Sequence, residues 1–414
     1  MNPAAERTHL GPALSLAERD RRHTVLRAFQ RDHGLDALVV FGWGRTALDQ
    51  YLTNEQQRAV VVMTPDGAVT SIVGRFPLDR YDDAGAAHER WVDDIRTGNP
   101  ATTLAAVLGE RGATRGTVGV VGLTSRAVGE YSGVIPHRSW EAVLSSSPDA
   151  TFVDVSADFE TLLLVKSAEE LDMIRYAAAL GERACEAFAH RTRAGVPESA
   201  PVAAALEAIV SGGGWLGGPL VIERAGAQRF AWGKPEWMSM GRPRVLQSGD
   251  TIGAELFAFY GGFESQQQID VSIGAPGPLL RELEEICLDS YRRGIDALRA
   301  GTSFADLCAI MHEPLTAAGV WNTGPLVQTV SPVIFNGATH VGLEADAGLR
   351  HLPRLPSSVA RDGDFEIRPG IAFAFEPNAV RDGERVCIGG TVLITEDGVE
   401  ELNSISNRVV VVDA

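Results

Sequence analysis

The residue with the clearest chemical potential in this sequence is Glu376, which follows an apolar run and directly precedes Pro377. Residues 371–375 are all apolar, which predicts a strand buried on both faces. Because proline excludes the α region for the preceding residue, Glu376 should be extended and rigidly held. A buried carboxylate is costly unless something pairs with it. We therefore expect Glu376 to bind substrate or transfer a proton; the alternative is a hydrogen bond to an internal donor such as His340.

Further polar side chains lie in the run Gln266-Gln267-Gln268, on a strand predicted over residues 267–273 and just before it. Side chains alternate along a strand, so Gln266 and Gln268 should point the same way, where their amides could hydrogen-bond a polar small molecule. The alternative is a solvent-exposed strand. His340 and His351 are candidate proton shuttles, because imidazole changes charge near neutral pH; a structural role is the alternative for each.

Residues 230–243 combine aromatic side chains with Pro, Gly and Met, which indicates a loop. Trp232 and Trp237 could form a stacking wall for a substrate, and Glu236 could act as an acid or base. Alternatively, the tryptophans pack in the core and Glu236 is solvated.

The first part of the sequence alternates strand and helix patterns, which predicts a small α/β domain over residues 1–165. Its strands are short apolar runs ended by turn residues, and its helices are amphipathic. We expect strands at residues 37–41, 59–63, 69–73, 117–122 and 152–155, and helices at residues 17–29 and 103–111.

The pattern changes near Lys166, where residues 167–170 (Ser-Ala-Glu-Glu) form a capping box at a helix start. Helices are expected at residues 280–300 and 303–318, and strands at residues 250–260, 267–273, 371–375, 390–394 and 409–412. Helices and strands grouped in blocks indicate an α+β domain over residues 166–414, with helices on one face of a curved antiparallel sheet.

Composition narrows the class of protein. A chain of 414 residues, 45% hydrophobic and 22% charged, is typical of a soluble globular protein with two domains. The net charge of −17 argues against a nucleic-acid partner. No apolar run reaches the roughly 18 residues of a membrane span, and no apolar signal-peptide core is found. The four cysteines lack metal-binding spacing, which favours buried reduced thiols and a cytoplasmic location.

Five segments in the second half, taken in order, resemble the creatinase/prolidase family. They are residues 164–171, 246–250, 260–263, 368–377 and 391–398. The N-terminal part is similar more loosely, through residues 51–53 and 91–95. The resemblance implies a pita-bread (creatinase/aminopeptidase) C-terminal domain preceded by a smaller α/β domain.

The resemblance also implies where the family's peptidases would hold two divalent ions, using two aspartates, a histidine and two glutamates. Carried over by position, these ligands fall on Glu255, Gln266, Thr339 (with His340 one step away), Glu376 and Gly389. Divalent ions prefer several anionic oxygens, which Gln266 and Gly389 cannot supply. We therefore expect no metal and no cofactor; a single weakly bound ion is the alternative.

Creatinases of this family imply a route without metal, in which carboxylates polarise a small substrate and histidine moves protons. Glu255 and Glu376, on neighbouring strands by analogy, would repel in a dry cavity, and one pKa would rise to give an acid/base pair. Alternatively they bind a guanidinium or amine. The leading interpretation is a metal-independent hydrolase or lyase that cleaves a C–N bond (amide or amidine type) in a small polar molecule. The alternatives are a non-catalytic ligand- or peptide-binding protein and an Xaa-Pro-type metallopeptidase with an altered metal site.

Arg58 precedes a predicted strand of the N-terminal domain. In creatinases an arginine at a similar place reaches into the partner subunit's site and grips the substrate carboxylate with its planar guanidinium. The resemblance thus implies a homodimer in which Arg58 binds substrate; a surface arginine is the alternative.

Overall fold

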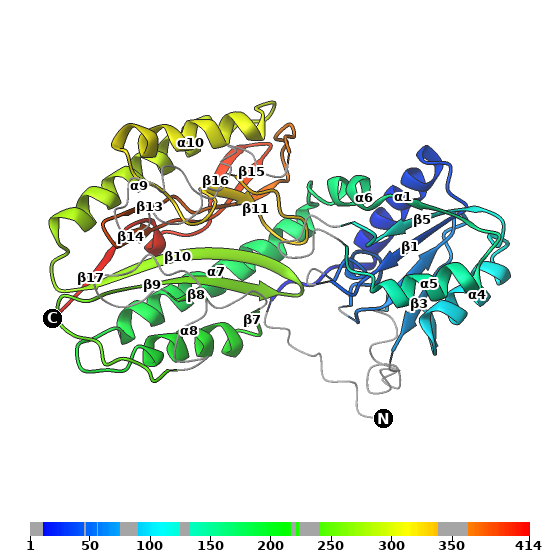
Figure 1. The fold of residues 1–414 in the computed structure, drawn as a ribbon, viewed down its shortest axis with the longest axis horizontal. Helices are drawn as coiled ribbons and strands as arrows, with labels where there is room; N and C mark the ends of the chain where they lie inside the picture. The colour runs from blue at the N-terminus through cyan, green and yellow to red at the C-terminus, as the bar shows by residue number, and fades with distance from the viewer. Residues whose placement is uncertain are drawn as a thin grey trace, which may run out of the picture. The chain divides into compact units, whose positions relative to one another are not determined.

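The computed structural model describes residues 11–44, 47–55, 57–74, 90–124, 133–216, 221–222, 241–337 and 363–414. Two compact units are present: unit 1 is built from Ala13–Leu163, and unit 2 from Leu164–Ala414 (Figure 1). Within the described part of the chain, every helix is too short or too polar to cross a membrane.

Unit 1 is a small α/β domain. Its helices are α1 (Leu16–Asp32), α2 (Gln50–Thr53), α4 (Pro100–Glu110), α5 (His137–Ser146) and α6 (Ser156–Leu162). Its strands are β1 (Ala37–Phe41), β2 (Val60–Met63), β3 (Val69–Val73), β4 (Asp94–Thr97), β5 (Thr117–Val121) and β6 (Thr151–Asp154).

Among the described residues of unit 1, six strands form one mixed sheet in the order β4-β3-β2-β1-β5-β6. β2 runs antiparallel to both of its neighbours, β1 and β3, whereas β5 is parallel to β1 and β6 is parallel to β5. Leu104 and Val107 of α4 and Val143 of α5 pack against apolar side chains of the central strands, including Val39 and Val120. This layer of helix on sheet is the core of the unit.

Unit 2 carries longer elements. Its helices are α7 (Ala168–Arg191), α8 (Ser199–Ser211), α9 (Pro278–Ala297), α10 (Phe304–Ala318) and the 3₁₀ helix η4 (Ile405–Asn407). Its strands are β7 (Trp215–Leu216), β8 (Val221–Ile222), β9 (Thr251–Tyr260), β10 (Phe263–Ile273), β11 (Val327–Thr329), β12 (Ala372–Phe375), β13 (Asn378–Arg381), β14 (Glu384–Cys387), β15 (Gly390–Thr395), β16 (Gly398–Glu401) and β17 (Val410–Val412).

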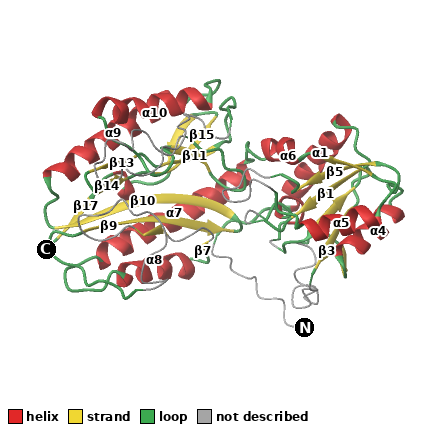
Figure 2. Ribbon diagram, in the orientation of Figure 1, coloured by secondary structure: helices red, strands yellow, loops and turns green. Residues whose placement is uncertain are grey.

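The centre of unit 2 is the long antiparallel hairpin of β9 and β10, closed by the turn at Gly261 and Gly262. It forms a sheet with β7, β8 and β17, and α7 and α8 cover one face of it (Figure 2). Alternate residues such as Leu256 and Ile269 face these helices, where Phe188 of α7 fills the core. The opposite face of the hairpin therefore points away from these helices, toward the rest of unit 2.

A second sheet, in the order β11-β12-β15-β16, and the two-stranded β13-β14 ribbon complete unit 2. The backbone N–H of Gln268 in β10 donates to the carbonyl of Gly389, at 3.0 Å, and so joins the two sheets. Helices α9 and α10 pack together, with Ser290 Oγ donating to the Met311 carbonyl at 2.7 Å. The α+β class and the pita-bread arrangement expected from the sequence are both present.

The predicted elements agree with the observed ones, apart from their ends. The capping box is complete: Ser167 N–H donates to Glu170 Oε2 at 2.8 Å, and Glu170 N–H to Ser167 Oγ at 3.2 Å. Helix α10 stops at Gly319, whose φ of 66° is left-handed. The strand expected over residues 267–273 begins earlier, at Phe263, because the hairpin pairs it along the full length of β9.

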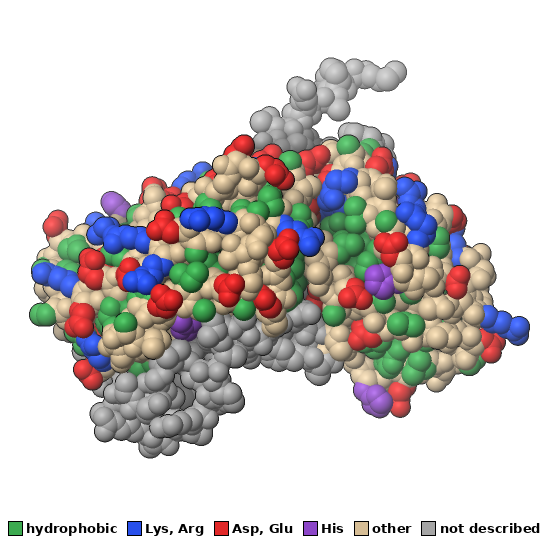
Figure 3. Space-filling model, turned by 90° about the horizontal axis from the view of Figure 1, so that it is seen from above, with side chains coloured by type: hydrophobic (Ala, Val, Ile, Leu, Met, Phe, Trp, Pro, Cys, Tyr) green, Lys and Arg blue, Asp and Glu red, His purple; other side chains and the backbone are tan. Residues whose placement is uncertain are grey.

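The cysteines are buried, as the sequence predicts. All four cysteines are buried and free. On the face drawn in Figure 3, acidic and basic side chains of the described residues are interspersed, not gathered by sign.

Candidate active site

A cluster of buried polar side chains lies on the face of the β9–β10 hairpin that points away from α7 and α8. The two-residue alternation of the strands places these residues on one face, with Glu255 directly opposite Gln268. The members on the hairpin are Glu255, Glu264, Gln266, Gln268 and Asp270. Each is buried, so the alternative of a solvent-exposed strand for Gln266 and Gln268 is wrong.

Gln267, between them, points the other way. Its amide lies against Gly181 of α7, where a Cβ atom would be too close to the Gln267 side chain, and it donates to Asn403 Oδ1 at 3.1 Å. Because Gly181 has no side chain, the Gln267 amide fits between the sheet and α7.

Glu376 reaches the same cluster from the second sheet. It follows β12, a strand buried along its whole length, and only 3% of the residue is exposed. Its backbone N–H donates to the Leu326 carbonyl at 2.9 Å, and its carbonyl accepts from Asn378 Nδ2 at 3.0 Å. These bonds, together with Pro377, fix where the carboxyl group points.

Glu255 and Glu376 were expected on neighbouring strands, and this is wrong. β9 and β12 belong to different sheets, and the two carboxyl groups approach across the junction between them. Gln268 makes the connection: its Nε2 donates to Glu376 Oε2 at 3.2 Å, while its residue pairs with Glu255 in the hairpin. Gln268 is thus an internal donor to Glu376.

Glu264 was not singled out from the sequence, although its spacing from Gln266 and Gln268 predicts the same face. It accepts hydrogen bonds from Gln266 Nε2 at 2.9 Å and from the Ser331 N–H at 2.6 Å. Gln328 of β11 completes the chain by donating from Nε2 to Gln266 Oε1 at 3.0 Å. The amides of Gln328 and Gln266 therefore form a chain of hydrogen bonds that ends at the Glu264 carboxylate.

Arg385 is the second residue that the sequence reasoning missed. It lies on β14, is completely buried, and places Nη2 3.4 Å from Glu255 Oε1. Burial lowers the pKa of Arg385, and the neighbouring Cys387 thiol acts in the opposite direction. A buried arginine is rare unless it is paired, so this contact is a defining feature of the cluster.

Burial raises the pKa of Glu376 well above its ordinary value of 4.5, and the carboxylates of Glu255 and Glu264 push it in the same direction. The amides of Gln268 and Gln328 partly counteract these effects. The arrangement therefore favours the neutral acid at Glu376.

The cluster does not supply the donor set of a two-metal site. Gln266 is a neutral amide that is already hydrogen-bonded within the cluster. Gly389 has a φ of +123°, and a Cβ atom there would lie 2.0 Å from the Phe375 carbonyl oxygen, so no side chain fits. Within the described ranges, no group of three or more His, Cys, Asp and Glu residues is placed to hold a metal. Thr339 and His340 lie outside those ranges.

Trp232, Glu236, Trp237, His340 and His351 lie outside the described residues.

Arg58 belongs to unit 1, two residues before β2, and is exposed with a φ of 50°.

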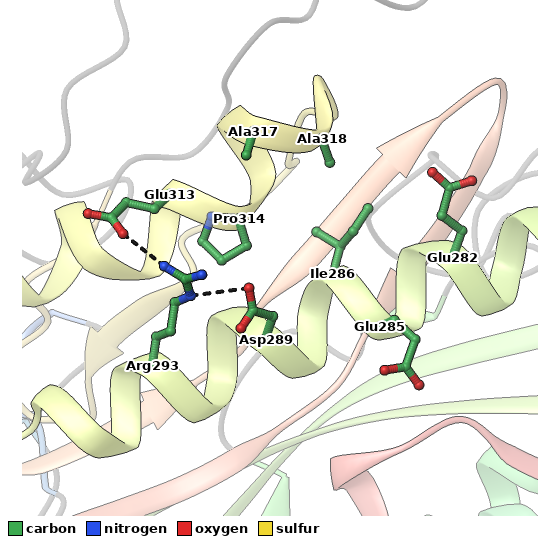
Figure 4. Close-up of a pocket in the computed structure, with 9 residues that line it drawn as sticks. All are labelled: Glu282, Glu285, Ile286, Asp289, Arg293, Glu313, Pro314, Ala317 and Ala318. Atoms are coloured by element: carbon green, nitrogen blue, oxygen red, sulfur yellow. Dashed lines mark hydrogen bonds and ion pairs between the residues drawn. The ribbon is translucent and has the colours of Figure 1, made fainter.

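A separate pocket of about 790 Å³ lies between α9 and α10. Arg293 is one of the residues that line it, and it donates to Asp289 at 3.1 Å and to Glu313 at 2.9 Å (Figure 4). None of the cluster residues lines this pocket. It is a feature of the helix pair, and the chemistry argued above does not involve it.

Comparison with known proteins identifies the family to which this chain belongs. The sequence profile of metallopeptidase family M24 matches residues 172–396, more than half of the chain. The chain therefore belongs to family M24, the creatinase/prolidase family, whose members are hydrolytic enzymes with the pita-bread fold.

Some individual relatives span nearly the whole chain, and others span about two thirds of it. Creatinase from Bacillus sp. (strain B-0618) is 24% identical over 417 residues, covering 94% of this chain and 92% of that protein. Xaa-Pro dipeptidase from Pyrococcus furiosus is 23% identical, covering 65% of this chain and 72% of that protein. The crystal structure of X-Pro aminopeptidase from Thermotoga maritima MSB8 has a TM-score of 0.72 at 17% identity, covering 94% of this chain and 99% of that chain.

Proposed function

We propose that this protein is a metal-independent hydrolase or lyase that cleaves a C–N bond of the amide or amidine type in a small polar molecule. The observation that carries the proposal is the pairing of Glu376 with Gln268, in a buried cluster that also contains Glu255. Packing alone would favour apolar residues at these positions, because burying carboxyl groups is costly. A role in chemistry explains why they are there.

In this proposal the two carboxyl groups have different tasks. Glu255 accepts a proton from the water that attacks the amide or amidine carbon, and Glu376 donates a proton to the departing nitrogen as the C–N bond breaks. His340 and His351 are proposed to return the proton from Glu255 to Glu376, which restores the starting state. Such acid–base steps are worth roughly 10²–10⁴-fold in rate.

We further propose that the remaining predicted residues bind the substrate. Gln268 Oε1 has no hydrogen-bond partner among the described residues, so it is an acceptor that a substrate N–H could satisfy. Gln266, Trp232, Trp237 and Glu236 would complete the pocket. Arg58 would be contributed by the partner in a cytoplasmic homodimer. The similarity to a creatinase along 94% of the chain supports a small substrate.

One observation favours a non-catalytic binding protein as a second candidate. Glu264 and Gln266 are held by hydrogen bonds inside the protein, so part of the cluster is already satisfied without a substrate. An Xaa-Pro metallopeptidase is supported less well, because Gln266 and Gly389 stand at two of its ligand positions.

The test is turnover of a panel of small amidines, guanidino acids, amides and Xaa-Pro dipeptides, with and without chelator. We expect one of the small nitrogen compounds to be cleaved at an undiminished rate in chelator, and E376Q to lower that rate by on the order of 100-fold or more. E198Q is the matched control, since Glu198 is also buried in unit 2 but instead accepts from the Arg244 N–H at 3.0 Å. Binding without turnover would favour the second candidate, and cleavage only of dipeptides with added metal would refute the proposal.

A further inference from the structure

The carboxylate cluster contains a guanidinium that the fold has buried completely. Arg385 projects from β14 to within 3.4 Å of Glu255, a residue 130 positions earlier in the chain. Arginine keeps its proton in proteins, so it brings a permanent positive charge into the cluster. Burying that charge is unfavourable unless an anion lies beside it. Glu255 meets this requirement, and Arg385 in turn meets the same requirement for Glu255.

The charge of these carboxylates could also be balanced by divalent ions. The backbone at Gly389 excludes the side chain that would help to hold such ions. In the family's peptidases the residue at this position is a glutamate that helps to hold the ions. Here the Gly389 carbonyl accepts from the Gln268 N–H, and the space for a Cβ atom is taken by the Phe375 carbonyl oxygen, 2.0 Å away. The left-handed φ of +123° independently disfavours any side chain. The junction between the sheets therefore leaves no space for a side chain at this ligand position.

We propose that Arg385 is the built-in counter-cation of the cluster and the positioning residue for Glu255, in the place of the divalent ions of the family's peptidases. The inference does not depend on the proposed reaction, because it concerns charge balance. It follows that the protein needs no divalent ion to keep its carboxylates buried.

The test compares R385Q with R381Q by thermal unfolding. Arg381 lies on the same β13–β14 ribbon, but its ion pair with Glu282, at 2.6 Å, is part-exposed, so R381Q controls for the loss of an arginine from this ribbon. We expect R385Q to lower Tm by about 10 °C, because it leaves a buried carboxylate without its cation. R381Q should lower Tm by about 2 °C or less.

A double variant keeps the test decisive if R385Q fails to fold. E255Q/R385Q removes both charges, so it should recover at least half of the Tm lost in R385Q, or fold where R385Q does not. R385K retains the charge without the planar fork and should fall between R385Q and the wild type.

Elemental analysis of the wild-type protein after dialysis against Mn²⁺ provides a second readout. We expect no Mn²⁺ above the buffer level. Wild-type protein that retains one or two ions per chain would overturn the proposal. So would an R385Q protein as stable as R381Q, or a double variant no more stable than R385Q.

Discussion

Replacing Glu376 with glutamine tests both the chemistry and the electrostatics of the cluster. E376Q keeps the shape of the side chain and removes its ability to donate a carboxylic proton. The Gln268 Nε2 donor, now 3.2 Å from Glu376 Oε2, can still donate to the amide oxygen of the new side chain. We therefore expect the fold to survive and turnover to fall by on the order of 100-fold or more, as for loss of a general acid.

The same variant changes how stability depends on pH. The folded-state pKa of Glu376 is raised above its ordinary value of 4.5, so the folded protein holds a proton that the unfolded chain releases. The stability that Glu376 contributes is then fully present below pH 4.5 and is lost as pH rises toward the folded-state pKa. The loss is about 1.4 kcal/mol for each pH unit between the two values. E376Q has no such proton, so it should gain stability relative to the wild type as pH rises from 5 to 8.

Denaturant unfolding at several pH values, alongside steady-state kinetics, measures both effects. Parallel stability curves for wild type and E376Q would contradict the assignment of a neutral Glu376. Unchanged kinetics, or a loss of activity accounted for by unfolding, would reject its catalytic role.

Three further predictions concern other parts of the chain. G389A should lower Tm much more than G398A: both glycines have a φ of +123°, but only at Gly389 is the Cβ position blocked, and equal losses would contradict the steric argument. Burial raises the pKa of Asp49 from 3.8 to about 7, so its contribution to stability is present below pH 3.8 and is lost as pH rises through 7. The D49N variant should lack this pH dependence, which amounts to about 4 kcal/mol in total. Urea unfolding at several pH values would refute the prediction if D49N showed the same pH dependence of stability as the wild type. Light scattering should find a dimer, and R58A should raise KM while leaving the dimer intact; a fully active monomer would rule out the proposed role of Arg58.

Local patterns in the sequence account for much of this protein. The capping box at Ser167 and Glu170 needs only residues three apart, and the strand alternation that aligns Gln266 with Gln268 needs only residues two apart. The apolar run before Glu376 likewise announces a buried strand. Because these signals depend on near neighbours, they can be recognised before the chain is folded, and in order they identify the family.

The contacts that complete the cluster depend on the tertiary structure. The contact between Arg385 and Glu255 joins residues 130 positions apart, and that between Gln268 and Glu376 joins residues 108 apart. Nothing near Arg385 in the sequence distinguishes it from a surface arginine, since its burial results from the packing of β14 against other strands and helices. The closed position at Gly389 depends on the carbonyl of Phe375, on a different strand. Sequence patterns indicate which secondary structure each segment prefers. The distances between segments, and the contacts between their charged side chains, are set only when the sheets pack together.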